Sequence, residues 1–131
     1  MSLHLNINDL TFTHVLTAMR GDGDTLDAER VSYVTHNADP AALRQGVYVV
    51  TVNDQIVYIG KYDGTLARRW LYERAGIIYH HKRKAIANEL RNGADVRVYA
   101  TKEAPVSTNN ADVERALIAS LKPAWNMQDA S

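Results

Sequence analysis

The chain of 131 residues contains no cysteine, and it holds only one phenylalanine and three prolines. The absence of cysteine excludes disulfide bonds, a thiolate metal site and a cysteine nucleophile. No apolar run approaches the roughly 20 residues that a membrane-spanning helix needs. The first ten residues, MSLHLNINDL, lack the basic start and the apolar stretch of a secretory signal peptide. We therefore expect a cytoplasmic protein, and its 46% of hydrophobic residues is enough for a core of its own.

Net charge is also lacking, because 15 basic side chains balance 15 acidic ones. The charges are unevenly distributed, however, since residues 61–102 hold 10 basic and 4 acidic side chains. Clustering of this kind gives a neutral protein one positive face, which suits contacts with the phosphates of a nucleic acid. A solvated helix face without such a partner explains the same charges about equally well.

Local patterns predict both strands and helices. Two β-branched runs meet at the turn-forming pair Asn53-Asp54, so residues 47–59 are expected to form a β-hairpin. Residues 95–101 alternate between apolar and polar, which predicts another strand with one buried face. The other expected elements are a helix over residues 8–20, a strand over 30–35, and helices over 65–76, 80–93 and 111–122. The first of these helices is predicted from the spacing of Phe12, Val15, Leu16 and Met19.

Together these elements predict an α+β fold with a small three-stranded sheet, antiparallel or mixed, flanked by helices. Residues 46–131 would form the main domain, and residues 1–45 would form an N-terminal extension made of a helix and a strand. The extension carries apolar side chains, so we expect it to contribute to a contact in a homo-oligomer, although it could equally cover the domain itself.

Each arm of the predicted hairpin carries a tyrosine beside a glycine, in residues 46–48 (GVY) and 58–60 (YIG). Glycine in a strand lets a ligand approach the backbone closely. Two phenol groups next to such glycines are more typical of a functional site than of a core.

The length of the hairpin loop decides whether the two phenols can act together. A regular two-residue turn at Asn53-Asp54 would place Tyr48 and Tyr58 on opposite faces of the sheet. A shared site requires a bulge, or a loop of odd length such as residues 53–55 with Val52 opposite Ile56.

Glu114 and Arg69 are candidate functional residues because of their positions on predicted helices. Glu114 borders the apolar stripe of residues 111–122, where a buried carboxylate is costly unless it is paired or bound to a metal. A structural ion pair is the alternative to metal binding or acid–base catalysis. Arg69 lies beside Trp70, which suits bidentate binding of a phosphate, although a surface arginine, as expected for Arg68, is the commoner case. With one convincing carboxylate, a site with two metal ions is disfavoured.

These residues, taken in order, resemble the GIY-YIG nuclease family. The family has two tyrosine motifs, an arginine in an L-x-x-R pattern, a glutamate on a later helix and an asparagine after it. The corresponding residues of this chain are Tyr48, Tyr58, Arg69, Glu114 and Asn126. The likeness covers residues 46–128 and is greatest to a phage member of the family. Val47 stands where isoleucine is usual, which is a swap of similar volume.

The resemblance implies hydrolysis of a phosphodiester bond in double-stranded DNA with one divalent cation, Mg²⁺ or Mn²⁺. It implies that Glu114 is the metal ligand and that Tyr48, helped by Tyr58, is the general base. Arg69 would stabilise the phosphate. Asn126 would orient Glu114 or a tyrosine, or contact the DNA. A non-catalytic DNA-binding module that keeps the fold is the alternative function.

The family also carries a histidine or lysine between the arginine and the glutamate. Four residues compete for this position, namely His80, His81, Lys82 and Lys84. The resemblance to the phage member favours Lys82, by its distance from the helix end at Asn92-Gly93, and implies that this residue neutralises the leaving group or orients the phosphate. The basic residues expected to contact DNA are Lys61, Arg68, Arg74, His80, His81, Arg83 and Lys84.

Overall fold

The computed structural model describes residues 4–7, 10–20, 31–71, 73–74, 77–78, 82–101 and 110–128. The strands are β1 (His4–Ile7), β2 (Leu10–Arg20), β3 (Val31–Thr35), β4 (Arg44–Val52), β5 (Gln55–Thr65), β6 (Glu73–Arg74), β7 (Ile77–Ile78) and β8 (Val96–Ala100). The helices are α1 (Leu66–Trp70), α2 (Arg83–Arg91), α3 (Asn110–Leu121) and α4 (Ala124–Gln128). Within these ranges, no helix is long and apolar enough to cross a membrane.

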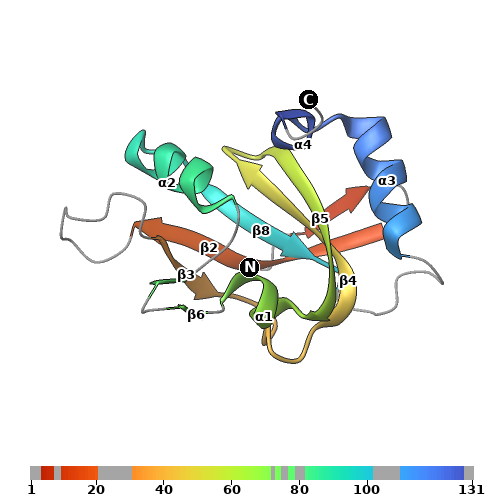
Figure 1. Cartoon of the computed structure of the whole chain (residues 1–131), viewed down its shortest axis with the longest axis horizontal. Coiled ribbons are helices and arrows are strands. Elements are labelled where there is room, and N and C mark those ends of the chain that lie inside the picture. Colours follow the sequence, from red (N-terminus) through yellow and green to blue (C-terminus); the bar gives the residue numbers. More distant parts are fainter. Residues whose placement is uncertain are drawn as a thin grey trace.

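The main sheet is antiparallel and larger than the three strands predicted (Figure 1). Its order is β1-β2-β8-β4-β5, with β3 also paired to β2, so the described residues give it six strands. The predicted core of β4, β5 and β8 is present, but the N-terminal strands extend it. The division into an extension of residues 1–45 and a domain of residues 46–131 stays a prediction, although β2 pairs directly with β8 across it.

The helix predicted over residues 8–20 is wrong, because this segment forms the long strand β2. A bulge between His14 and Leu16 interrupts its pairing with β8. The extra residue moves the buried side chains from one face to the other, so Phe12 packs on one side of the sheet and Val15 and Leu16 pack on the opposite side. Because of the bulge, the buried residues of this strand have the three- and four-residue spacing that is typical of a helix.

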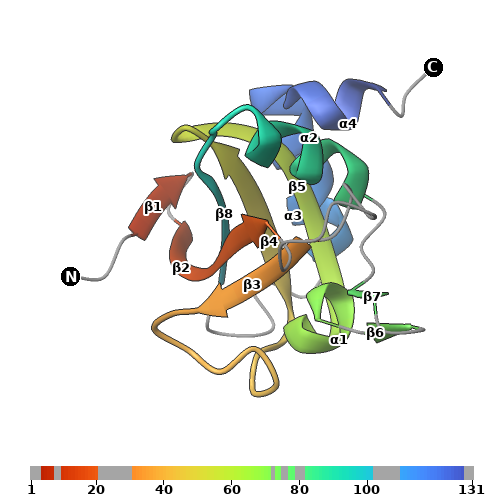
Figure 2. The ribbon, with the colours of Figure 1, turned by 90° about the vertical axis from the view of Figure 1, so that its left-hand side faces the viewer.

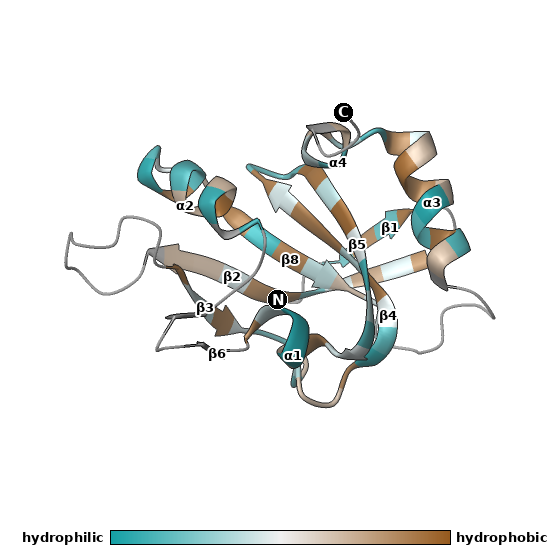
Figure 3. Cartoon of the chain, in the orientation of Figure 1, coloured by the Kyte–Doolittle hydropathy of each residue, from teal (hydrophilic) through white to brown (hydrophobic). Residues whose placement is uncertain are grey.

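Hydrophobic side chains cover both faces of the sheet, and the colours of Figure 3 mark hydrophobic positions along β4, β5 and β8. The larger cluster contains Leu66 and Trp70 of α1, Ile86 of α2 and Trp125 of α4. The smaller cluster lies on the other face and includes Leu117 of α3. β8 lies between β2 and β4, so both of its edges are paired (Figure 2). Both of its faces are buried, whereas the sequence predicted one, because its side chains belong to both clusters.

The helices near the candidate site are shorter than predicted. The helix expected to run to Gly76 ends at Trp70, and residues 73–74 instead pair with residues 77–78. In α2 the described helix begins at Arg83 and ends before Asn92-Gly93, as expected. In α3 the predicted apolar stripe is confirmed at Leu117, but Leu121 is exposed.

The β4–β5 hairpin has a two-residue turn and a bulge. Asn53 and Asp54 adopt φ values of 49° and 68°, and Val52 pairs with Gln55. The suggested three-residue loop is therefore wrong. The register shifts immediately after the turn, so that Val57 is the extra residue of a bulge. This bulge returns both motif tyrosines to the same face, as a shared site requires.

Candidate active site

Tyr48 and Gly60 are directly opposite each other in the β4–β5 ladder. A Cβ atom on Gly60 would lie under 3.0 Å from the Cζ and the hydroxyl of Tyr48, so the end of the ring lies over the glycine. Gly46 and Tyr62 form the mirror arrangement, and the Tyr62 hydroxyl donates to the Thr101 carbonyl at 2.8 Å. The glycine of each motif therefore makes room for a tyrosine ring from the opposite strand, and the space expected for a ligand is filled by protein.

Tyr48 is completely buried among other aromatic rings. Trp70 packs edge-on against it with ring centroids 5.2 Å apart, and the Tyr58 ring lies at 6.2 Å. Burial raises the pKa of Tyr48 well above its usual range, and the charge and hydrogen bond of Arg69 oppose this shift only in part. The phenol therefore stays protonated in the free protein.

Arg69 extends from α1 to the phenol of Tyr48, with which it is hydrogen-bonded. Burial by itself would lower the pKa of Arg69, but the hydrogen bond with Tyr48 and the electrostatic interactions with Tyr48, Tyr58 and Glu114 raise it. The guanidinium is thus a positive charge within electrostatic reach of both tyrosines and of Glu114.

Glu114 lies on α3 next to β5. Burial raises the pKa of its carboxyl, while the charge of Lys61, the backbone N–H that Lys61 donates to it, and Arg69 act to lower the pKa. Asp63 contributes a second negative charge that raises the pKa further. The carboxylate is therefore half-buried, oriented by a backbone hydrogen bond and close to two cationic side chains.

Helix α4 contains the candidate residue Asn126 and binds a second one, Lys82, through a backbone carbonyl. The Asn126 side chain accepts from the Ile59 N–H at 2.8 Å and donates to the Ile59 carbonyl at 2.9 Å. The Trp125 carbonyl accepts from the ammonium of Lys82 at 3.2 Å, and this ammonium lies 5.2 Å from the centroid of the Tyr58 ring. Asn126 thus fixes the backbone between Tyr58 and the motif glycine, and the Lys82 ammonium lies over the Tyr58 ring.

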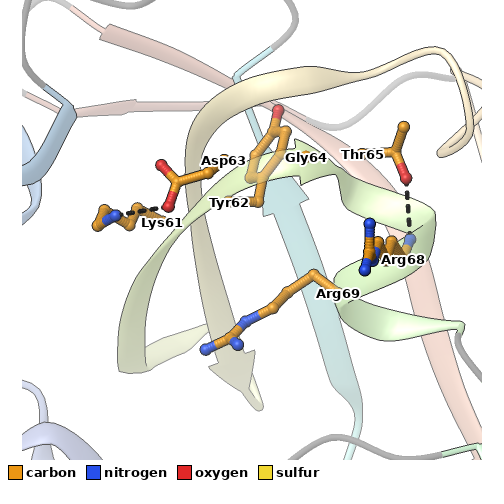
Figure 4. Close-up of a pocket in the computed structure, with 7 residues that line it drawn as sticks. All are labelled: Lys61, Tyr62, Asp63, Gly64, Thr65, Arg68 and Arg69. Atoms are coloured by element: carbon orange, nitrogen blue, oxygen red, sulfur yellow. Dashed lines mark hydrogen bonds and ion pairs between the residues drawn. The ribbon is translucent and has the colours of Figure 1, made fainter.

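A pocket of about 280 Å³ lies at the junction of β5 and α1 (Figure 4). Its lining residues are Lys61, Tyr62, Asp63, Gly64, Thr65, Arg68 and Arg69. Thr65 caps α1 by accepting the backbone N–H of Arg68 at 3.0 Å. Figure 4 shows the side chains of Arg68 and Arg69 leaving α1 in different directions. The pocket therefore presents three cationic side chains around one carboxylate.

The structure brings some predicted residues together and leaves others apart. Tyr48, Tyr58, Arg69 and Glu114 lie around the outer strand β5, with Lys61 and Arg68 in the adjoining pocket. Lys84 is exposed on α2, where the backbone of Arg83 also lies, and the backbone of Arg74 lies in β6. His80 and His81 are outside the described residues.

The sequence reasoning missed two features of this site. One is Asp63, which the alternation along β5 could have placed on the same face as Lys61. The second feature is the burial of Tyr48, which follows from Trp70 packing against it. Among the residues described, no group of three or more histidine or acidic side chains could hold a metal ion.

Comparison with known proteins supports the fold. No family model and no curated protein sequence matches the chain. A solved structure of a mutant of bacteriophage T4 EndoII matches it with a TM-score of 0.57 and 19% sequence identity, covering 86% of this chain and 90% of that one. The chain has the EndoII fold. EndoII is a GIY-YIG nuclease, so the predicted resemblance to this family is confirmed for the fold.

Proposed function

We propose that this protein is a metal-dependent DNA endonuclease that hydrolyses phosphodiester bonds, as a phage endonuclease II-like or restriction-type enzyme. The observation that carries the proposal is that Arg69, which lines a cationic pocket, is hydrogen-bonded to Tyr48 and within electrostatic reach of Glu114, on a fold shared with EndoII. Arginine and carboxylate at one place match what phosphate hydrolysis needs, which is a fixed cation for the phosphate and a ligand for a metal ion.

The residues present fit a hydrated Mg²⁺ or Mn²⁺ ion. Mg²⁺ is usually held by one or two carboxylates together with phosphate oxygens and waters. Glu114 offers one half-buried carboxylate, and the Lys61 N–H takes up only part of its capacity to accept. The ion would supply charge neutralisation for the phosphate and a more acidic attacking water. We therefore assign Glu114 as the ligand.

Among the protein groups, Arg69 binds the scissile phosphate and stabilises the charge that develops on it. Tyr48 orients Arg69 through their hydrogen bond. Its proposed further role as general base, helped by Tyr58, requires more positive charge than the free protein supplies, because burial raises the pKa of the Tyr48 phenol.

Two residues complete the proposed site from the side of α4. The Lys82 ammonium lies over the Tyr58 ring and orients it. When this ammonium gives up its hydrogen bond to the Trp125 carbonyl, it binds the phosphate or the leaving group instead. Asn126 keeps the backbone of Ile59 in place. The remaining proposed DNA contacts are Lys61, Arg68, Arg74, His80, His81, Arg83 and Lys84.

A plasmid-nicking assay tests the proposal. Wild-type protein should nick supercoiled plasmid with Mg²⁺ or Mn²⁺ and should be inactive with EDTA. Glu114→Gln should lose cleavage while still binding DNA, since glutamine keeps an acceptor for the Lys61 N–H but loses the charge. Arg69→Lys should lose about a hundredfold or more in rate, because a point charge cannot replace the bidentate fork.

Arg68→Lys is the matched control, since the side chain of this neighbouring arginine leaves α1 in a different direction from that of Arg69. Cleavage by Glu114→Gln at more than a few percent of the wild-type rate would contradict the metal-ligand role. DNA binding by the wild type without any cleavage would instead support the alternative, a binding module that keeps the fold.

A further inference from the structure

We propose that Asp63 is an autoinhibitory carboxylate, which holds Lys61 in the free protein and weakens the binding of a DNA phosphate in the pocket beside Arg69. The inference rests on the proposed function. Lys61 and Asp63 are two residues apart on β5, so their side chains leave the same face of the strand. Asp63 Oδ2 lies 2.8 Å from Lys61 Nζ, and Figure 4 shows the carboxylate turned towards this ammonium.

The charges around the pocket make Asp63 unusual. Of the seven residues that line it, three are cationic (Lys61, Arg68 and Arg69), and Asp63 is the acidic one. Its side chain is 79% exposed, so a ligand can reach the Lys61–Asp63 pair from solvent. Exposed ion pairs of this kind are weak, and a phosphate can therefore replace Asp63 as the partner of Lys61.

The replacement leaves a negative charge beside the bound phosphate. Asp63 stays within electrostatic reach of Glu114, which already contributes another negative charge at this end of β5. A phosphate in the pocket thus gains Lys61 but is repelled by the carboxylate that Lys61 has left. Removal of the Asp63 charge should strengthen phosphate binding, and most of this gain should depend on Lys61.

Fluorescence anisotropy with a labelled DNA duplex in EDTA measures this effect without cleavage. Asp63→Asn should bind the duplex more tightly than the wild type, by up to about fivefold, which is the range of an exposed ion pair. In the wild type, Asp63 takes up a cation from solution when DNA draws Lys61 away, which offsets one cation released from the DNA. The asparagine of the variant takes up none, so the slope of log K against log salt should steepen by up to about one.

Asp54→Asn is the matched control. It removes the same charge from a side chain that is 81% exposed and 3.9 Å from Arg97, in the turn of the same hairpin. This variant should bind DNA like the wild type. A gain equal to that of Asp63→Asn would mean that net charge alone is responsible, and would overturn the inference.

The Lys61→Gln background tests the route of the effect. If Asp63 acts by holding Lys61, then Asp63→Asn gives a clearly smaller gain when Lys61 is absent, because only the direct repulsion between Asp63 and the phosphate is left to remove. An undiminished gain in this background overturns the inference, as does the lack of any gain in the wild-type background. DNA binding without a gain leaves the proposed function intact, whereas failure of the wild type and of Asp63→Asn to bind DNA overturns both.

Discussion

Replacing Gly60 by alanine should disrupt the packing of Tyr48 against β5. The new Cβ would lie under 3.0 Å from the Cζ and hydroxyl of Tyr48, and this ring is completely buried, so the ring or the strand must shift. Forcing a methyl group into a packed core costs about 1–3 kcal/mol of unfolding free energy. At roughly 4 °C per kcal/mol for a domain of this size, the melting temperature should fall by roughly 4–12 °C.

Thermal unfolding followed by circular dichroism measures the change, and Gly64→Ala is the control on the same strand. The nearest atom to a Cβ on Gly64 is Arg68 Cδ at 3.9 Å, so this variant should stay within about 0.5 kcal/mol of the wild type. In a Tyr48→Leu background, which lacks Cζ and the hydroxyl, Gly60→Ala should cost much less. Equal melting of the two alanine variants, or an unchanged cost of Gly60→Ala in the Tyr48→Leu background, would refute the ring contact as the cause.

Two more predictions concern the N-terminal strands. The His14 and His36 rings stack with centroids 4.4 Å apart, and burial, then His36 and Arg97, lower the pKa of His14. The unfolded chain then binds a proton at His14 more readily than the folded protein does. The contribution of His14 to the unfolding free energy should therefore be constant above the unfolded pKa of about 6.5 and fall below it. Urea titrations against pH should show a smaller fall in His14→Gln, and an unchanged fall would exclude His14. Met19 and Val34 are each 47% exposed on one face of β2 and β3. If this face forms the contact of the proposed homo-oligomer, Val34→Glu should dissociate the oligomer in sedimentation experiments. An unchanged mass would place the contact elsewhere.

The sequence was sufficient to predict the elements that depend on local signals. Asn53-Asp54 marks the hairpin turn because both residues tolerate positive φ. Asn92-Gly93 ends α2 for a similar reason, with Gly93 at φ 82°. These features are encoded within a few residues, so no knowledge of the rest of the fold is needed. The requirement for a shared face left two alternatives, a bulge or a loop of odd length, and the structure has a bulge at Val57.

The sequence was not sufficient where long-range packing decides. The spacing of Phe12, Val15 and Leu16 fits a helix until pairing with β8 introduces the bulge in β2. Similarly, the closeness of Asp63 to Glu114 depends on α3 lying next to β5, and these two residues are far apart in the chain. Contacts of this kind follow from the assembled sheet and cannot be derived from local patterns.

The position of β5 explains why candidate functional residues come from distant parts of the chain. An outer strand has unpaired backbone groups that must be covered, and here Glu114 accepts from Lys61 while Asn126 bonds both backbone groups of Ile59. The same side chains therefore cover the edge of the sheet and belong to the candidate site. Loss of cleavage in a Glu114 or Asn126 variant is evidence for a chemical role only where the unfolding free energy is unchanged. Glutamine at position 114, which keeps the bond to Lys61, meets this condition better than alanine does.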